Sequence, residues 1–542
     1  MNRNIRHPSC HGASCLRRLP VAWLLAGAAA VSAAEPARAP APALPRFDVF
    51  QYVVDGNSVL DALAIEAAVS PFLGEGKTLT EVESARAALE KRYHDAGYLT
   101  VVVSIPDQAV DSGEVALHVV EAVVDRLKVK GAEYTLPSAV KAAVPELAEG
   151  QVPNFNSLQT QLAALNRGAD ARVTPVLRAG KLPGTVEVQL DVDDQLPLHG
   201  SVELSNRQTP NTTSERLSAS LRYDNLWQLG HSLGLTLQVA PQKPSDARVA
   251  ALTYVLPTGR ASDVLSTYWV HSRSDFASLA SAPGLGLLGN SDTLGWRYTA
   301  PLGADGDLTQ TLAGGIDYKN VQQTVTVQDG SSTDSPIVYL PLVGTYSAGL
   351  AGDQRTSTLD LGLTLGLRGL FGNSDAKFNA KRAGASANYL ALRAGVSHSE
   401  TLARWTLFGR IDSQAASGPL VPTEQMVAGG AESVRGYLEG ERAGDMGLRA
   451  TVELRTPQLS PAGGNSAWRI GGLFFVDMAR LKTLQPVAPQ PGLHALRGAG
   501  AGLRLSAPGG LTLEADAARA LVDGDSTRAR STRIHARAVW SY

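Results

Sequence analysis

A two-residue alternation of apolar and polar side chains, sustained from about Leu198 to Tyr542, places the strongest constraint on the fold of this chain. One run alternates over residues 216–223, and similar runs occur at 448–455, 503–506 and 533–540. Because successive side chains of a β-strand point to opposite faces, the pattern predicts strands that have one apolar and one polar face. A soluble sandwich alternates in the same way, so the lengths of the connections have to distinguish a sandwich from a barrel.

The connections favour a closed barrel. Short links at every second junction alternate with longer ones; the short links include 228–231, 351–353 and 507–510, and the long ones are 272–290, 322–335, 372–384 and 413–445. Long loops on one side, alternation along each strand and an even number of strands, here about sixteen, are typical of an outer-membrane β-barrel. Such a sheet must close because an open edge in lipid leaves backbone groups unpaired. We therefore predict a transmembrane barrel over residues 196–542 with a water-filled, polar lumen.

Residues 1–34 are predicted to be a signal peptide. Four arginines precede or flank the start of an apolar stretch at 19–31, and small residues follow, with cleavage after Ala33 or Ala34. Both cysteines lie in this segment, so the mature chain is expected to contain neither a disulfide nor a thiolate metal site. Residues 35–45 are rich in Ala and Pro and predict an extended tether.

Two similar α+β units, 46–121 and 122–195, are predicted between the tether and the barrel. Each has the order strand, helix, helix, strand, strand; the predicted elements are 47–54, 60–73, 80–96, 98–105 and 114–124 in the first unit and 125–130, 138–147, 157–166, 172–177 and 185–192 in the second. In the helix at 80–96, Thr80 and Glu83 fit a capping box and Gly97 a C-terminal stop. Open edges of such small sheets can accept an extended partner strand, although the units can also be read as spacers.

The predicted long loop at 413–445 contains the segment Val434-Arg435-Gly436-Tyr437. Arginine offers a planar fork that matches a carboxylate, and glycine permits backbone conformations or close approaches that other residues do not. The tyrosine can pack against an inner wall. An Arg-Gly pair is also common in solvated turns, so this segment alone does not establish a site.

A matching acid lies further along the chain, in the strand segment Phe474-Phe475-Val476-Asp477. A charge in such an apolar strand needs a partner or water, and Arg435 is the partner that we expect. If Asp477 faces the lumen together with Phe475, then Phe474 and Val476 face lipid, as their chemistry prefers.

This layout resembles the outer-membrane translocators of two-partner secretion, the haemolysin and filamentous-haemagglutinin exporters, whose periplasmic repeats are called POTRA domains. The resemblance covers essentially the whole mature chain. Val434–Tyr437 matches the family signature in the loop between strands eleven and twelve, and Phe474–Asp477 resembles Phe-x-Phe-Asp on strand thirteen, with Val476 in place of the second Phe. The resemblance implies that the loop folds into the lumen and that Arg435 pairs with Asp477. Some relatives also carry an N-terminal plug helix, which the short tether is not expected to form.

The fold class expected from this resemblance is two α+β POTRA repeats in the periplasm followed by an outer-membrane β-barrel of about sixteen antiparallel strands. The implied function is a channel that captures a large exoprotein through its N-terminal secretion region and exports it to the cell surface. The barrel would contact outer-membrane lipid and would be inserted by the barrel assembly machinery. A β-barrel assembly insertase of the same superfamily and a passive porin are the alternatives, although insertases commonly carry more POTRA repeats and a porin needs none.

The composition and motifs exclude several other classes of function. Lys and Arg number 49 against 51 Asp and Glu, and no basic cluster stands out, so no nucleic-acid partner is expected. No catalytic, cofactor or metal constellation is evident, and the chain is not expected to be an enzyme. Histidines such as His199, His231, His271 and His535 are scattered, and we expect lumen-lining or loop roles for them.

Overall fold

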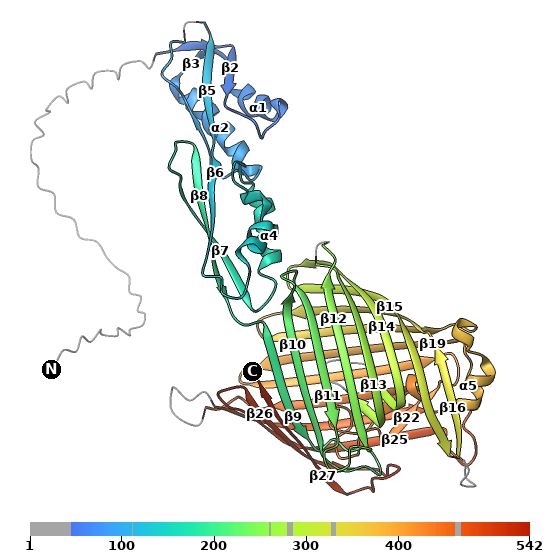
Figure 1. Cartoon of the computed structure of the whole chain (residues 1–542). Helices are drawn as coiled ribbons and strands as arrows, with labels where there is room; N and C mark the ends of the chain where they lie inside the picture. The colour runs from blue at the N-terminus through green and yellow to red at the C-terminus, as the bar shows by residue number, and fades with distance from the viewer. Residues whose placement is uncertain (1–44, 111, 260–261, 279–285, 327–331, 461–467) are drawn as a thin grey trace, which may run out of the picture.

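The computed structural model describes residues 45–542 except 111, 260–261, 279–285, 327–331 and 461–467, and it places two small α+β units before a closed barrel (Figure 1). The predicted signal peptide and all but the last residue of the predicted tether lie outside the described residues. Within the described part of the chain, no helix is both long and apolar enough to cross a bilayer.

The first unit contains a three-stranded sheet of order β2-β5-β4, in which β2 is parallel and β4 antiparallel to β5. Its elements are β1 (Phe47–Val49), β2 (Gln51–Asp55), α1 (Ala62–Val69), the 3-10 turn η1 (Ser70–Phe72), β3 (Gly74–Lys77), α2 (Leu79–Asp95), β4 (Val101–Ser104) and β5 (Glu114–Glu121). The predicted first strand is broken into β1 and β2. Strand β3 was not predicted, because its sequence Gly-Glu-Gly-Lys has no strand signal; it pairs with β1.

Helix α2 packs one face into the core of this unit. The buried side chains are Val82, Ala85, Leu89 and Tyr93. The predicted capping box was wrong by two residues, because Thr78 and Glu81 fit the same spacing, and the structure uses this earlier pair. The Glu81 carboxylate accepts a hydrogen bond of 2.7 Å from the Thr78 backbone N–H.

The second unit has a sheet of order β6-β8-β7, again with one parallel and one antiparallel pairing. Its elements are β6 (Val123–Lys130), α3 (Pro137–Ala142), the 3-10 turn η2 (Pro145–Leu147), α4 (Phe155–Leu165), β7 (Ala171–Ala179) and β8 (Thr185–Asp194). Val140, Leu147, Leu158, Val188 and Leu190 are among the residues of its separate hydrophobic core.

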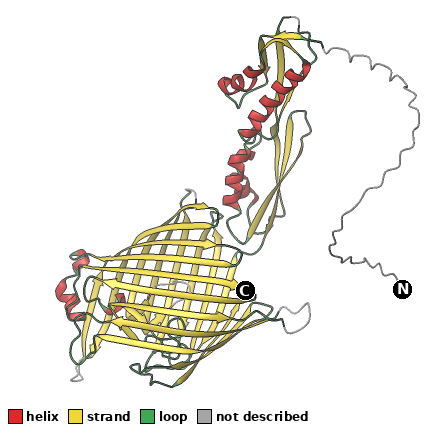
Figure 2. Ribbon diagram, turned by 180° about the vertical axis from the view of Figure 1, so that it is seen from behind, coloured by secondary structure: helices red, strands yellow, loops and turns green. Residues whose placement is uncertain are grey.

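The two units meet where α2 ends and α4 begins, so the helices run nearly end to end (Figure 2). Asn154, the N-cap of α4, donates a side-chain hydrogen bond of 3.0 Å to the Ala96 carbonyl, and the Phe155 N–H donates one of 2.8 Å to the Gly97 carbonyl. Gly97 has φ +100°, and a Cβ there would lie 2.6 Å from the Asn154 side-chain oxygen. Only glycine therefore both ends α2 and lets α4 approach this closely.

The barrel closes because β27 pairs with β9. Its strands are β9 (Leu198–Ser205), β10 (Arg216–Leu226), β11 (His231–Val239), β12 (Ala247–Pro257), β13 (Val264–Ser278), β14 (Gly286–Asp305), β15 (Leu308–Thr326), β16 (Ser332–Tyr339), β17 (Leu342–Ala351), β18 (Arg355–Gly366), β19 (Tyr389–Leu402), β20 (Trp405–Ala416), β23 (Met446–Arg455), β24 (Arg469–Lys482), β25 (Leu493–Ser506), β26 (Leu511–Ala520) and β27 (Thr532–Ser541). Segments β16 and β17 both pair with β15 and are two halves of one strand interrupted at Pro341. The seventeen segments therefore make sixteen strands, as the sequence predicts.

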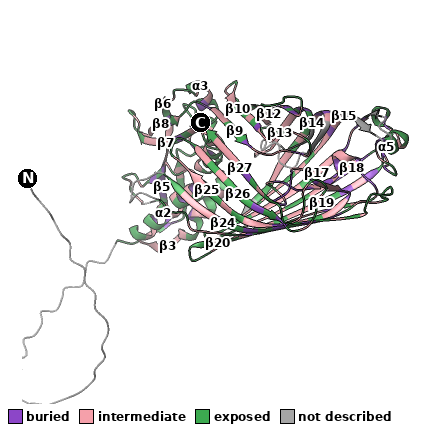
Figure 3. Ribbon diagram, turned by 90° about the horizontal axis from the view of Figure 1, so that it is seen from below, coloured by how far each residue is buried: buried purple, intermediate pink, exposed green. Residues whose placement is uncertain are grey.

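Side chains of the wall alternate between lumen and lipid. On β24, Phe474 and Val476 are each 57% exposed, whereas Phe475 is 3% and Asp477 0% exposed. Figure 3 shows intermediate and exposed residues along most barrel strands, with buried residues in short patches. The barrel is thus held by its closed hydrogen-bond ladder and not by one continuous apolar core.

All four predicted long loops differ from the observed connections. Much of 272–290 is strand because β13 and β14 extend into it, and much of 322–335 is strand because β15 and β16 extend into it. Strands that project beyond lipid need no apolar face and so lose the alternation. The predicted loop 372–384 contains α5 (Asp375–Lys381), preceded by the 3-10 turn η3 (Leu370–Gly372). The predicted loop 413–445 begins only after Ala416 and contains its own short hairpin.

The core of the first unit can be tested by shortening one buried leucine. Leu89→Ala should lower the free energy of unfolding of the periplasmic fragment 46–195 by about 2–5 kcal/mol, because Leu89 is 0% exposed and leaves a cavity. Leu63→Ala is the matched control, because Leu63 is 75% exposed on α1 and should cost little. Urea unfolding followed by circular dichroism measures both, and equal midpoints would contradict the assigned packing of α2.

Candidate functional site in the barrel lumen

The connection between β20 and β23, residues 417–445, folds back into the bore and is called the lumen loop below. It contains the 3-10 turn η4 (Pro422–Glu424) and a hairpin of β21 (Met426–Ala428) and β22 (Arg442–Gly444). Figure 1 draws β22 inside the outline of the barrel. The loop lies against β14 at η4 and against the inner face of β24 at Arg435, so it reaches both sides of the lumen.

Arg435 and Asp477 meet in the closest contact of the lumen loop with β24. The Asp477 carboxylate accepts three hydrogen bonds from Arg435, from Nε at 2.8 Å, from Nη2 at 2.8 Å and from the backbone N–H at 3.0 Å. The Arg435 side chain is 5% exposed and that of Asp477 0% exposed. This is the bidentate geometry that a guanidinium can form and an ammonium cannot.

Arg435 also joins a wider charge network that the sequence did not reveal. Its Nη1 lies 2.9 Å from Glu453 on β23 and 3.5 Å from Asp516 on β26. Arg455 pairs with Glu453 at 2.7 Å, and Arg504 pairs with Asp516 at 2.6 Å. Together with Asp477, three guanidinium groups balance three carboxylates, and the side chains of Arg455 and Arg504 remain 43% and 30% exposed. Glu453 and Asp516 occupy inward-facing positions of strands in which apolar and polar side chains alternate. This position is the sequence signal that could have identified them as residues of the lumen.

The ring of Phe475 supports the same guanidinium. The Arg435 Cζ lies 3.4 Å from the centre of the Phe475 ring, a stacked cation–π contact. Phe475 therefore holds the fork flat while Asp477 and the other carboxylates accept its N–H groups. Phe474 and Val476 take no part, since they face lipid.

The neighbours of Arg435 in the motif fix the loop backbone against the wall. Val434 is fully buried in an apolar cluster with Tyr437. The Gly436 N–H donates to Nε2 of His535 at 3.0 Å, and Gly436 has φ +98°. The Tyr437 hydroxyl lies 2.8 Å from both the Arg497 and the Val522 carbonyl oxygens, to either of which it can donate.

A column of glycines on β25 provides the space into which this part of the loop fits. Gly498, Gly500 and Gly502 share the inward face of the strand. A Cβ at Gly498 would lie 2.0 Å from the Arg435 carbonyl oxygen, one at Gly500 2.7 Å from the Phe475 ring, and one at Gly502 1.9 Å from the Asp516 carboxylate. The wall therefore has no side chains where the charge network needs room.

Asp445, the last residue of the lumen loop, ties the loop to two other connections. Its carboxylate accepts hydrogen bonds from Arg382, just after α5, at 2.5 and 2.7 Å. It also accepts backbone N–H groups of Leu420 at 2.9 Å and Leu484 at 2.6 Å. The side chain is 0% exposed. The β18–β19 connection, which contains α5, is thus bound to the end of the lumen loop that precedes β23.

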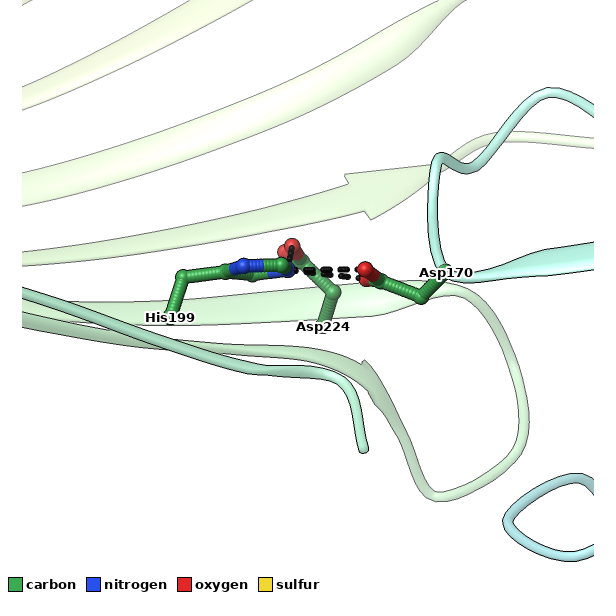
Figure 4. Close-up of side chains that lie close together, drawn as sticks. All are labelled: Asp170, His199 and Asp224. Atoms are coloured by element: carbon green, nitrogen blue, oxygen red, sulfur yellow. Dashed lines mark hydrogen bonds and ion pairs between the residues drawn. The ribbon is translucent and has the colours of Figure 1, made fainter. Parts of the chain in front are cut away.

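A separate polar cluster joins the second α+β unit to the barrel (Figure 4). The Nε2 atom of His199 on β9 lies 2.9 Å from Asp170 and 3.5 Å from Asp224 on β10. Ligand atoms of these three residues lie within 4.8 Å of one another, as a metal ion would require. Asp224 is already bound by Arg222 at 2.9 Å and by Ser232, so the geometry is that of an ion-paired joint. The contact of His199 with Asp170 could not be predicted from the sequence, because Asp170 belongs to a different unit.

The same joint includes a turn organised by Asp194. Backbone N–H groups of Glu133, Tyr134 and Thr135 donate to its carboxylate at 2.7 to 3.0 Å. Burial acts to raise the pKa of Asp194, but these donors outweigh it and hold the pKa below its usual value. Gln228, in the β10–β11 turn of the barrel, bonds to the Tyr134 carbonyl at 3.1 Å.

Comparison with known proteins places this arrangement in a family. The family model described as "Haemolysin secretion/activation protein ShlB/FhaC/HecB" matches residues 184–505, more than half of the 542-residue chain. The chain belongs to the haemolysin secretion/activation family. A second model, "POTRA domain, ShlB-type", matches residues 47–122, which is the first α+β unit.

Relatives of this haemolysin secretion/activation protein agree with that assignment. The chain is 24% identical over 437 residues to the outer membrane transporter CdiB of Escherichia coli, covering 74% of this chain and 68% of the relative. The solved structure of CdiB from Escherichia coli has a TM-score of 0.61 at 19% identity, covering 94% and 93% of the two chains. BamA from Haemophilus ducreyi lacking POTRA domains 1–3 has a TM-score of 0.55 at 15% identity, covering 92% and 100%, and so shares the fold. The chain is an outer-membrane transporter of the two-partner secretion type.

The glycine column generates a test of how the lumen loop of this secretion protein is seated. Gly498→Ala should displace the Arg435 carbonyl and loosen the loop, and single-channel conductance in planar bilayers should rise at least about twofold, since a displaced loop widens the path for ions. Gly344→Ala on β17 is the control, because a Cβ there meets nothing within 4 Å. Equal conductance of the two variants would show that the loop does not depend on this fit.

Proposed function

We propose that the chain captures a large exoprotein in the periplasm through the N-terminal secretion region of that partner, and passes it through the barrel to the cell surface without catalysing a reaction. The arrangement of the lumen loop carries this proposal. A loop held in a wet bore by ion pairs and small-residue contacts can move aside while the closed hydrogen-bond ladder of the wall stays intact. The contacts of the loop with the charge network can thus be broken without breaking the hydrogen bonds that hold the barrel wall together.

The two α+β units supply the means of capture. In sheet orders β2-β5-β4 and β6-β8-β7, the outer strands have one unpaired edge each, to which an extended segment can add by backbone hydrogen bonds. Such binding reads backbone more than side chains, which suits a long partner in an extended state. In this proposal the lipid-facing side chains of the barrel contact outer-membrane lipid, and the barrel assembly machinery inserts the barrel. No nucleic acid takes part in this function. The family match favours secretion over the insertase alternative.

Removal of the periplasmic units tests capture. Deletion of residues 47–194 should leave a barrel that inserts and conducts ions but exports no partner, because the remaining strands close without them. Export is measured as partner in the culture medium, and insertion by the presence of the barrel in the outer-membrane fraction. Undiminished export by the truncated protein would show that the units are spacers.

The role of the Arg435–Asp477 pair is tested by a double-mutant cycle on secretion rate. Arg435→Ala and Asp477→Ala should each reduce secretion at least about tenfold with the barrel inserted, because each leaves a buried partner uncompensated, at a cost of about 3–5 kcal/mol. The double variant should be less severe than the sum of the two effects. Arg435→Lys should restore secretion only partly, since an ammonium lacks the fork.

Strictly additive effects in this cycle would contradict a functional pairing. Wild-type secretion by Arg435→Ala would contradict any role of the lumen loop in export.

A further inference from the structure

Glu424 is another buried charge of the lumen loop, and the Arg435 network does not include it. Its carboxylate accepts hydrogen bonds from Lys319 Nζ at 2.6 Å and from the Tyr339 hydroxyl at 2.8 Å, and Arg393 lies 3.8 Å away. The Glu424 side chain is 1% exposed and that of Lys319 12% exposed. Removing any one of these donors leaves the buried carboxylate with less compensation for its charge, which costs free energy.

The backbone around Glu424 is fastened to the same part of the wall. Its carbonyl accepts hydrogen bonds from Gln414 at 3.1 Å and from Arg393 at 3.3 Å. The hydroxyl of the preceding Thr423 lies 2.8 Å from that of Tyr339. Strands β15, β16, β19 and β20 therefore all hold the short turn η4, which gives a defined docking position and not a casual contact.

The two fastenings hold different sectors of the wall. The Glu424 contacts come from β15, β16, β19 and β20, and the Arg435 contacts come from β23, β24 and β26, so the two sets follow one another around the ring of sixteen strands. Between them the loop follows the wall, since the Val427 carbonyl accepts a hydrogen bond of 3.0 Å from Arg449 on β23 and Met426 packs in the cluster that contains Leu481 of β24.

The two fastenings also have opposite polarity. The loop contributes an acid to the bases Lys319 and Arg393 in one sector of the wall, and a base to Asp477, Glu453 and Asp516 in the next. Exchanging the two ends of the loop would place like charges together, so the charges specify one orientation of the loop.

We propose that Glu424, held by Lys319 and Tyr339, is a positioning residue that keeps the lumen loop seated inside the bore and so closes the resting channel. The inference deepens the proposed function, on which it rests for the meaning of channel closure. Loss of this fastening frees the part of the loop around η4 while Arg435 still holds the other part, so the channel leaks ions without losing its loop.

The test measures conductance of the full-length protein in planar bilayers without any partner. Glu424→Gln should raise the mean conductance at least about twofold, since the amide leaves Lys319 and Arg393 without a counter-charge. Asp360→Asn is the matched control, because Asp360 is an exposed acid on the inward face of β18 that bonds to Ser347 of the neighbouring strand. It should conduct like the wild type.

A charge exchange distinguishes positioning from general stability. Lys319→Glu and Glu424→Lys should each leak, and the double variant should return toward wild-type conductance, incompletely because Arg393 then faces a lysine. If Glu424→Gln does not insert, Tyr339→Phe removes only the hydroxyl that contacts Glu424 and Thr423, and it should give a smaller leak. Wild-type conductance of the inserted variants, or a double variant as leaky as either single one, overturns the inference. Because no partner is present, these outcomes are independent of whether the protein secretes.

Discussion

The position of the loop inside the barrel depends on the contacts of the Arg435 guanidinium. A sixteen-strand wall is wide enough to hold water, so a loop inside it cannot be kept in place by an apolar core of ordinary depth. Arg435 solves this by satisfying its donors on Asp477, Glu453 and Asp516 while its flat face rests on Phe475. The glycines of β25 follow from this arrangement, since any larger side chain would fill the space that the network occupies.

Two contacts of opposite charge, at Glu424 and at Arg435, give the loop a second property. A single fastening would let the loop swing about one point, whereas contacts at Glu424 and Arg435 define both ends of the segment between them. Neither end needs an apolar core of its own to be specific, because burial makes an unpaired charge costly. Asp445 then binds the end of the loop to Arg382, in the connection that contains α5.

Much of this architecture is visible in the sequence, and the exceptions have physical reasons. Alternation over residues 216–223 and similar runs predicts a barrel because lipid imposes an apolar outer face on every strand. The same rule fails for 272–290, where β13 and β14 extend beyond the need for that face. Arg435 and Asp477 were predictable as a pair because an acid in an apolar strand requires a partner. Glu453, Asp516 and Glu424 were not, because their partners lie on strands or connections whose register the sequence does not specify.

The end-to-end contact of α2 and α4 sets the distance between the two α+β units. These helices have 17 and 11 residues, which at about 1.5 Å per residue make a rod of roughly 40 Å. Hydrogen bonds at Ala96 and Gly97 keep the rod from folding at its joint. An extended chain spans about 3.3 Å per residue, so about a dozen residues of extended chain are needed to cover this length. Under the capture proposed above, two segments of a partner that are spaced more closely than this cannot bind the far ends of both units at once.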